Sequence, residues 1–328
     1  MSGLSVHVQQ ALGVEMIIAI DSTQLGPALG GCRWRPYADP AAARTEALYL
    51  ANSMTQKAAL AGLALGGGKA VVCGDPRQRT RDQLLAFGDF VASLDGHYVT
   101  AADMGTGEDE MDVIGEKTEH VVGRSRAAGG CGDPGPFTAL GVWMAIEAAL
   151  DHQGRPLEGS RCAVQGVGSV GSLLVRHLLD AGAEVVVADP DLERLGGLPE
   201  GVEVVRPDQI LSGPCDVLVP CGPARVIDRG LAAELGCSVV CGAANNVLAD
   251  DDAARVLHER GVLYVPDYLS NAGGLIHLAV AREGGDEAAS REGLRVIPDN
   301  LERVLALCAT EGVDPVVAAE RLVSQALV

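Results

Sequence analysis

The feature that most constrains the fold is a glycine-rich turn that joins a strand pattern to a helix pattern. Residues 162–164 are apolar, a complete G-x-G-x-x-G follows at 166–171, and residues 173–179 have helical periodicity. A second strand pattern, 184–189, ends in an aspartate. In this order the glycines let a pyrophosphate approach the helix N-terminus, and the acid can accept hydrogen bonds from a ribose. We therefore expect a dinucleotide to bind at Gly166, Val167, Gly168, Ser169, Val170, Gly171 and Asp189.

Asp189 also indicates which dinucleotide is bound. Its charge would repel a 2′-phosphate, so NAD is expected in preference to NADP. Arg194 is the nearby cation that could reverse this preference. It lies in the segment 190–200, whose glycines and proline leave room only for an abbreviated helix.

The residues that follow predict a doubly wound parallel sheet, with further strands at 216–219, 238–241 and 262–265. Asparagine-bearing turns come after two of these strands, at Asn245-Asn246 and at Asn271. Asparagine is common in turns for conformational reasons alone. The carboxyl edge of such a sheet is also where a nicotinamide would lie, so a functional interpretation of these turns stands beside the conformational one.

The N-terminal part alternates strand and helix patterns and predicts a second α/β layer structure. Asp39-Pro40 supplies a cap and a first-turn proline for a long helix. Expected strands are 14–20, 70–73 and 98–101, expected helices are 40–60 and 80–95, and 21–35 is expected to be loop-rich. The chain after 286 has helical patterns.

The glycine–proline cluster at 129–136 is the best candidate for a hinge between domains. We expect an α/β protein of two domains with a cleft between them. Residues 1–134, completed by C-terminal helices at about 300–328, would form an α/β substrate domain. Residues 135–299 would form a Rossmann-like, doubly wound dinucleotide-binding domain.

Two lysines, Lys57 and Lys69, carry the main catalytic signal of the first domain. Lys69 stands directly behind Gly66-Gly67-Gly68, which can form a turn with φ > 0 and admit a ligand close to the backbone. A desolvated lysine is suited to acid–base catalysis near neutral pH. A P-loop is excluded, because Leu63 and Ala70 occupy positions that need a glycine and a hydroxyl. From this stretch alone, a surface lysine after a tight turn fits equally well.

Asp103 follows the strand at 98–101. Ligand crevices in α/β sheets lie at strand ends, so a catalytic carboxylate is expected there. A helix-capping aspartate would occupy the same kind of position. The residues around Asp103 do not decide between the two.

Composition narrows the class of partner. The formal net charge of −19 repels polyanions, so neither nucleic acid nor an anionic membrane is expected as a partner. We find no signal segment and no apolar run long enough to span a bilayer, and we expect a cytoplasmic protein. The nine cysteines include no C-x-x-C pair and no histidine completes a site near them, so we expect reduced cysteines and no metal.

The order of these motifs resembles the glutamate, leucine, phenylalanine and valine dehydrogenase family, and within it the branched-chain and phenylalanine enzymes. The resemblance covers nearly the whole chain. It rests on LGPALGG with Arg33, MTQK…GLALGGGKA, TAADMGT, GDPGPFTALGV, QGVGSVG, PCG, GAANN and PDYLSNAGG.

The resemblance implies roles for matching residues. Lys57 would bind the substrate α-carboxylate with main-chain help at Gly30, Lys69 would be the catalytic lysine, and Asp103 would relay protons to and from the substrate nitrogen. Three further positions match residues near the nicotinamide or the substrate amino group: Thr138 and Asn246 near the former, and Asn271 near the latter.

The side-chain pocket is also inferred from the resemblance. Leu29 stands where glutamate-specific relatives carry a lysine, so an acidic substrate side chain would be buried without a partner at a cost of several kcal/mol. Leu275 and Leu278 match pocket-wall positions, and Ala101 would lie opposite them. This set predicts an aliphatic pocket of moderate depth.

We therefore expect NAD-dependent oxidative deamination of a neutral L-amino acid of the leucine or valine type, giving the 2-oxo acid and ammonia, and the reverse reductive amination. One alternative is an enzyme for phenylalanine or another aromatic amino acid. Another is a catalytically idle NAD-binding homologue, since fold does not imply function. The expected partners are these small molecules and further copies of the chain in a homo-oligomer.

Overall fold

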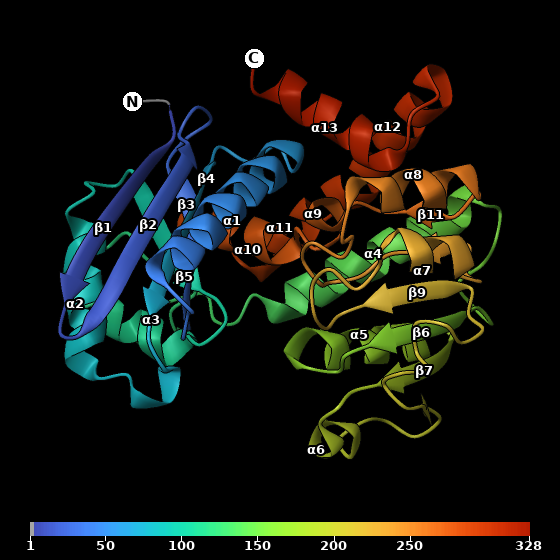
Figure 1. The fold of residues 1–328 in the computed structure, drawn as a ribbon, viewed down its shortest axis with the longest axis horizontal. Coiled ribbons are helices and arrows are strands. Elements are labelled where there is room, and N and C mark those ends of the chain that lie inside the picture. The colour runs from blue at the N-terminus through green and yellow to red at the C-terminus, as the bar shows by residue number, and fades with distance from the viewer. Residues whose placement is uncertain (1–2) are drawn as a thin grey trace. The chain divides into compact units, whose positions relative to one another are not determined.

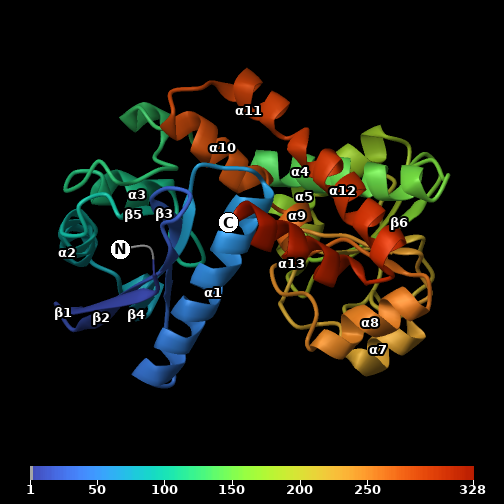
Figure 2. The same ribbon diagram turned by 90° about the horizontal axis from the view of Figure 1, so that it is seen from above.

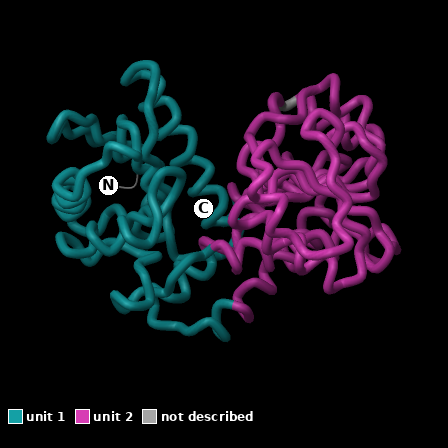
Figure 3. The backbone as a smooth tube through the Cα atoms, turned by 90° about the horizontal axis from the view of Figure 1, so that it is seen from below, with its two compact units in different colours: residues 1–134, 276–290, 325–328 teal, residues 135–275, 291–324 magenta. Residues whose placement is uncertain are grey.

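The computed structural model describes residues 3–328, apart from the side chain of Asp251. Its contacts divide the chain into two compact units (Figure 3). Unit 1 comprises Met1–Pro134, Ile276–Ser290 and Gln325–Val328, and unit 2 comprises Gly135–Leu275 and Arg291–Ser324. Among the described residues, no helix combines the length and the apolar character needed to cross a membrane.

Unit 1 is built on a five-stranded mixed sheet with the order β1-β2-β4-β3-β5. Strand β2 pairs antiparallel with β1 and β4, whereas β3 runs parallel to β4 and β5. In Figure 2, α1 lies on one face of this sheet and α2 and α3 lie on the other. The bounds are β1 Ser5–Ala11, β2 Val14–Ser22, β3 Ala28–Arg35, β4 Gly66–Cys73, β5 Tyr98–Ala102, α1 Pro40–Leu60, α2 Arg81–Ala92 and α3 Glu108–Ile114, with 3₁₀ turns at Pro76–Gln78 and Arg126–Ala128.

Helix α1 has the predicted extent and the predicted N-terminus. Asp39 caps it by accepting a hydrogen bond from the backbone nitrogen of Ala42 at 2.8 Å, and Pro40 occupies the first turn. Alanines on the buried face bring the helix close to the sheet, because they add little bulk. This second core of unit 1 contains Ala43, Ala47 and Ala51 of α1 with Ile17, Ala19 and Val71 of the sheet.

Two predictions for unit 1 are wrong. The segment 21–35, expected to be loop-rich, contains strand β3, and the expected turn at Gly66–Gly68 is the first part of strand β4. The glycines serve close packing instead of a turn. A Cβ on Gly67 would lie 2.1 Å from the backbone nitrogen of Thr55 in α1, and one on Gly66 would lie 1.9 Å from a backbone oxygen of Ser22.

Unit 2 has the predicted parallel sheet, with the order β11-β10-β9-β6-β7-β8. In Figure 2, α4 and α5 lie on one side of β6, and α7 and α8 lie on the other. Helix α6 has four residues, as the abbreviated segment predicted. The bounds are β6 Arg161–Gln165, β7 Glu184–Ala188, β8 Glu203–Val204, β9 Val217–Pro220, β10 Val239–Val240, β11 Leu263–Tyr264, α4 Gly135–His152, α5 Ser169–Asp180, α6 Leu192–Leu195, α7 Arg229–Glu234 and α8 Asp251–Glu259.

The C-terminal part is helical, as expected, but its grouping differs from the expected one (Figure 1). Residues 291–324 group with unit 2, and of the expected segment 300–328 only the last four residues group with unit 1. The reason lies in packing: α12 contacts α4, where a Cβ on Gly141 would lie 2.7 Å from Cδ1 of Ile297. The bounds are α9 Asp267–Ser270, α10 Gly273–Arg282, α11 Glu287–Gly293, α12 Val296–Glu311 and α13 Pro315–Ala326.

Candidate active site

One face of the unit 1 sheet collects several of the expected site residues. Side chains alternate along a strand, and paired residues of neighbouring strands share a face. Lys69 therefore lies on the same face of β4 as Val71, which packs under α1. Register places Leu29 beside Gly67 and Ala101 beside Gly31, so Leu29, Gly31, Arg33 and Ala101 belong to that face too. Leu29 and Ala101 are both buried.

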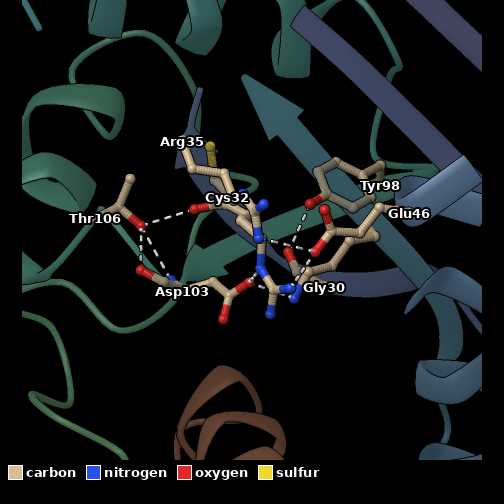
Figure 4. Close-up of polar contacts among 9 residues, drawn as sticks. Gly30, Cys32, Arg35, Glu46, Tyr98, Asp103 and Thr106 are labelled. Atoms are coloured by element: carbon tan, nitrogen blue, oxygen red, sulfur yellow. Dashed lines mark hydrogen bonds and ion pairs between the residues drawn. The ribbon is translucent and has the colours of Figure 1, made fainter. Parts of the chain in front are cut away.

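A chain of ion pairs runs across this face. The Nζ of Lys69 lies 2.7 Å from Oδ2 of Asp103, and the same oxygen accepts a hydrogen bond from Nε of Arg33 at 2.9 Å. Arg33 in turn donates from Nη1 to Oε1 of Glu46 in α1 at 2.5 Å. Figure 4 shows the two carboxylates, Asp103 and Glu46, that take part in this chain. Two of the predicted site residues, Lys69 and Asp103, are thus in direct contact.

The electrostatics of this chain keep Asp103 ionised. Burial alone would raise the pKa of the Asp103 carboxyl, but the charges of Lys69 and Arg33 and their hydrogen bonds outweigh it and hold that pKa well below its ordinary value. Arg33 is partly buried, with 13% of its side chain exposed. Burial opposes its charge, yet Asp103 and Glu46 together raise the pKa of its guanidinium.

The loop that carries Asp103 is fixed to β3. The hydroxyl of Thr106 donates to the backbone oxygen of Cys32 at 2.8 Å and accepts from the backbone nitrogen of Asp103 at 3.0 Å, as Figure 4 shows. The backbone nitrogen of Trp34 donates to Met104 at 2.8 Å. A Cβ on Gly31 would lie 2.7 Å from Cβ of Asp103, so only glycine lets the loop sit this close to the strand.

Strand β3 is packed just as tightly at Gly30, the residue expected to help bind a carboxylate through its main chain. A Cβ there would lie 1.7 Å from the backbone oxygen of Gly68. The backbone oxygen of Gly30 accepts a hydrogen bond from the hydroxyl of Tyr98 at 2.5 Å (Figure 4). Burial raises the pKa of Tyr98 well above its ordinary value, so this hydroxyl stays a donor.

Lys57 lies in the last turn of α1 and is 9% exposed. Lysine is rarely buried to this degree unless its ammonium group has a partner. The sequence placed Lys57 and Lys69 twelve residues apart, and the structure places one on α1 and the other on the strand face that α1 covers.

Unit 2 offers a backbone cradle at the predicted fingerprint. Gly166 has φ +93°, and a Cβ on Gly171 would lie 2.1 Å from the backbone oxygen of Gly166. Among the described residues, no side chain caps the N-terminus of α5, where Gly168 is the N-cap. A Cβ on Gly168 would extend into open space, with the guanidinium of Arg194 nearest at 3.7 Å. A pyrophosphate fits this cradle, because unpaired helix amides and missing side chains are what it requires.

The carboxylate of Asp189 holds the fingerprint loop in shape. Its Oδ2 accepts from the backbone nitrogen of Val167 at 2.9 Å, and its Oδ1 accepts from that of Asp191 at 2.9 Å. The side chain is 3% exposed. The two other x positions of the motif, Ser169 and Val170, begin α5.

The asparagine turns of unit 2 are joined to each other. Asn271 donates from Nδ2 to the backbone oxygen of Ala243 at 3.2 Å and to Oδ1 of Asn245 at 2.9 Å. Its own Oδ1 is buried without a hydrogen-bond partner among the described residues, which leaves an acceptor for a ligand. Asn246, at φ +55°, belongs to the same turn.

Thr138 is placed near this cluster. It lies in the first turn of α4, and a Cβ on Gly273 would be 3.2 Å from its Cα. The two leucines expected in the pocket wall both lie in α10 and are buried. Leu275 belongs to unit 2, whereas Leu278 belongs to unit 1, where its Cδ2 approaches Gly123.

Sequence reasoning missed the second half of the ion-pair chain. Arg33 was noted only within a motif, and Glu46 and Thr106 were not identified at all. The signal was present in the sequence, because a strand through 28–35 would have put Arg33 on the face of Leu29. Metal ligands were not expected, and the described residues contain no group of three or more His, Cys, Asp or Glu side chains that could hold a metal ion.

Comparison with known proteins places this geometry in a family. A family model described as "Glu/Leu/Phe/Val dehydrogenase, dimerisation domain" matches residues 3–120, and one described as "Glutamate/Leucine/Phenylalanine/Valine dehydrogenase" matches residues 129–192 and 191–283.

Similar proteins cover almost the whole chain. A leucine dehydrogenase of Bacillus subtilis is 41% identical over 95% of this chain and 87% of its own length. A valine dehydrogenase of Streptomyces coelicolor is 42% identical over 96% of this chain and 89% of its own. The crystal structure of L-tryptophan dehydrogenase from Nostoc punctiforme superposes with a TM-score of 0.83 at 35% identity, over 99% of this chain and 96% of that one. The chain belongs to the glutamate, leucine, phenylalanine and valine dehydrogenase family.

Proposed function

We propose that the protein is an amino-acid dehydrogenase that converts a branched-chain L-amino acid, water and NAD⁺ to the 2-oxo acid, ammonium, NADH and a proton, and that also runs the reverse reductive amination. The observation that carries this proposal is the contact between Lys69 and Asp103 at 2.7 Å, on a buried strand face. The relatives named for leucine and valine support the branched-chain substrate.

When bound, NAD would supply the acceptor for the hydride from the substrate Cα. The residues that would hold it are those of the fingerprint from Gly166 to Gly171, with Thr138 and Asn246 expected nearer the nicotinamide. The protein's own task is then to bind the substrate, to activate water for attack on the resulting imine and to move protons to the departing ammonia.

In its neutral form, Lys69 takes the proton from the attacking water. Asp103 is ionised and 2.7 Å away, so its charge compensates the ammonium that this step leaves on Lys69. Asp103 then exchanges protons with the substrate nitrogen. Arg33 holds the carboxylate from its other side and keeps it aimed at Lys69.

Substrate recognition is divided between charge and shape. Lys57 pairs with the substrate α-carboxylate, helped by the main chain at Gly30, and the open acceptor of Asn271 receives the substrate amino group. Leu29, Ala101 and Leu278, all of unit 1, form the apolar wall for the side chain. An acidic substrate side chain would lose hydration against Leu29 without gaining a partner.

A kinetic panel of valine, leucine, isoleucine, phenylalanine, tryptophan and glutamate, followed by NADH absorbance, tests the proposal. We expect the three aliphatic substrates to give the highest kcat/KM and glutamate to be rejected. The margin over aromatic substrates is modest, because one methylene in an apolar pocket is worth about 1–3 kcal/mol. Preference for phenylalanine or tryptophan would overturn the pocket argument alone. No turnover with any amino acid would support an idle homologue.

We also propose a homo-oligomer in which β1 takes part. This strand is the edge of the unit 1 sheet, and the matching family model is described as a dimerisation domain. Val6 and Val8 of this strand and Leu4 and Leu12 on either side of it are exposed apolar residues that a second copy would cover. The molar mass in solution, measured by light scattering, tests this proposal.

A further inference from the structure

Asp189 has little capacity left for a cofactor. Both of its oxygens accept backbone hydrogen bonds, one from Val167 within the fingerprint and one from Asp191 after the strand. Its side chain is 3% exposed. The carboxylate that the sequence assigned to the ribose is therefore first of all a support for the glycine loop.

The side chain of Arg194 is exposed, whereas that of Asp189 is buried. Its Nη1 lies 3.7 Å from Oδ2 of Asp189, and its Nε lies 3.2 Å from Oδ2 of Asp191. Its side chain is 54% exposed, and Nη1 is also the nearest atom, at 3.7 Å, to a Cβ built on Gly168. The guanidinium thus lies beside the second glycine of the fingerprint, next to the helix terminus expected to receive the pyrophosphate.

We infer that Arg194, rather than Asp189, determines how much affinity for NADP the protein keeps, because Arg194 provides a partial subsite for a 2′-phosphate. This inference rests on the proposed function, because it assumes that the fingerprint binds a nicotinamide dinucleotide. Two effects act together. The charge of Arg194 and the two amide donors offset the repulsion that Asp189 would exert on a 2′-phosphate, and the guanidinium itself is a strong phosphate partner.

The subsite is partial because acidic neighbours share the guanidinium. Asp191 pairs with Nε, and Glu193 is exposed on the same short helix, α6. Both carboxylates disfavour a phosphate. NAD therefore stays the better ligand, while NADP keeps measurable affinity instead of being excluded.

Dissociation constants for NADH and NADPH, measured by quenching of protein fluorescence or by calorimetry, test the inference without turnover. We expect the parent to bind both, NADH more tightly. Arg194→Ala should raise the NADPH dissociation constant by about 10- to 100-fold, in line with the loss of a charge-assisted phosphate contact. The NADH dissociation constant should change by less than about threefold. Arg206→Ala is the matched control, because Arg206 is an exposed arginine of the same unit that pairs with Asp208. It should change neither constant.

A second variant separates the two candidate residues. Asp189→Asn loses one of the two carboxylate oxygens that accept hydrogen bonds from the loop backbone. It should raise the NADH and NADPH dissociation constants by similar factors. If Asp189 were the discriminating residue, this variant would instead improve NADPH relative to NADH. That result would overturn the inference. So would an unchanged NADPH dissociation constant in Arg194→Ala, or a parent protein that binds NADH but does not bind NADPH at millimolar concentration. Binding of neither dinucleotide would refute the proposed cofactor as well.

Discussion

The candidate sites of the two units consist of different components of the chain. In unit 1 the site consists of charged side chains in contact, Lys69 with Asp103 and Asp103 with Arg33, all on one face of a mixed sheet. In unit 2 it consists of backbone amides and missing side chains at the start of α5, and its buried carboxylate, Asp189, stabilises the loop itself.

This difference determines what a substitution can do. Removing one charge in unit 1 takes away a chemical group and leaves its partners buried, so turnover is lost while the dinucleotide loop is untouched. Adding one methyl group in unit 2 fills space that the cofactor needs. Glycine also differs between the units, since it serves helix–strand packing at Gly67 and ligand approach at Gly168.

The largest effect is expected at the catalytic lysine. Lys69→Ala should lower kcat by about 10²–10⁴-fold, the usual contribution of a positioned acid–base group. Steady-state kinetics with the best substrate of the panel measure it. Lys117→Ala is the control, because Lys117 is a surface lysine of the same unit whose ion pair to Asp89 is long, at 3.5 Å. A comparable loss of kcat in Lys117→Ala would contradict a specific catalytic role for Lys69.

The two kinds of glycine give the next largest effect. In Gly67→Ala the new Cβ would meet the α1 backbone at 2.1 Å, so the free energy of unfolding should fall by about 1–3 kcal/mol or more. In Gly168→Ala the nearest atom is 3.7 Å away, so stability should stay within about 0.5 kcal/mol while the NADH dissociation constant rises. Denaturant unfolding and NADH titration of both variants measure this. Equal stability losses would contradict the distinction.

The smallest effect is a pH dependence of stability at Asp103. Its pKa is lower in the folded than in the unfolded protein, so its ionisation contributes stability that is fully present above the unfolded pKa, about 3.9, and is lost as the pH falls through the folded pKa. At pH 7, Asp103→Asn should be less stable than the parent, because Lys69 and Arg33 lose their counter-charge. The gap should narrow towards pH 3, because Asp103 of the unfolded parent takes up a proton there while Asp103 of the folded parent stays ionised. A stability difference between the parent and Asp103→Asn that grows as the pH falls would contradict this prediction.

Unit 2 could be predicted from sequence almost element by element, because each strand and turn there has a local signal. The fingerprint glycines, the short α6 and the strands through Val217 and Val239 all follow the expected order. In parallel sheets buried on both faces, the apolar runs are continuous and therefore easy to find.

Unit 1 was predicted less well, because its glycines allow close packing against residues that are far away in the sequence. Gly30 and Gly31 made a strand look like a loop, yet they are glycines because Gly68 and Asp103, dozens of residues away, come within contact. The pairing of Arg33 with Asp103 depends on the parallel register of β3 and β5, which no local pattern specifies. For Lys69 and Asp103 the local patterns left a catalytic and a structural interpretation open, the family resemblance implied the catalytic one, and their direct contact required the structure.

The affinity of Lys69→Ala for NADH tests most directly whether chemistry and dinucleotide binding are separate properties of the two units. Titration of this variant with NADH, beside the parent and Gly168→Ala, gives three dissociation constants to set against three turnover numbers. The account predicts an unchanged constant for Lys69→Ala despite its loss of turnover, and a raised constant for Gly168→Ala. Loss of NADH binding in Lys69→Ala would contradict it and would make Lys69 a structural residue.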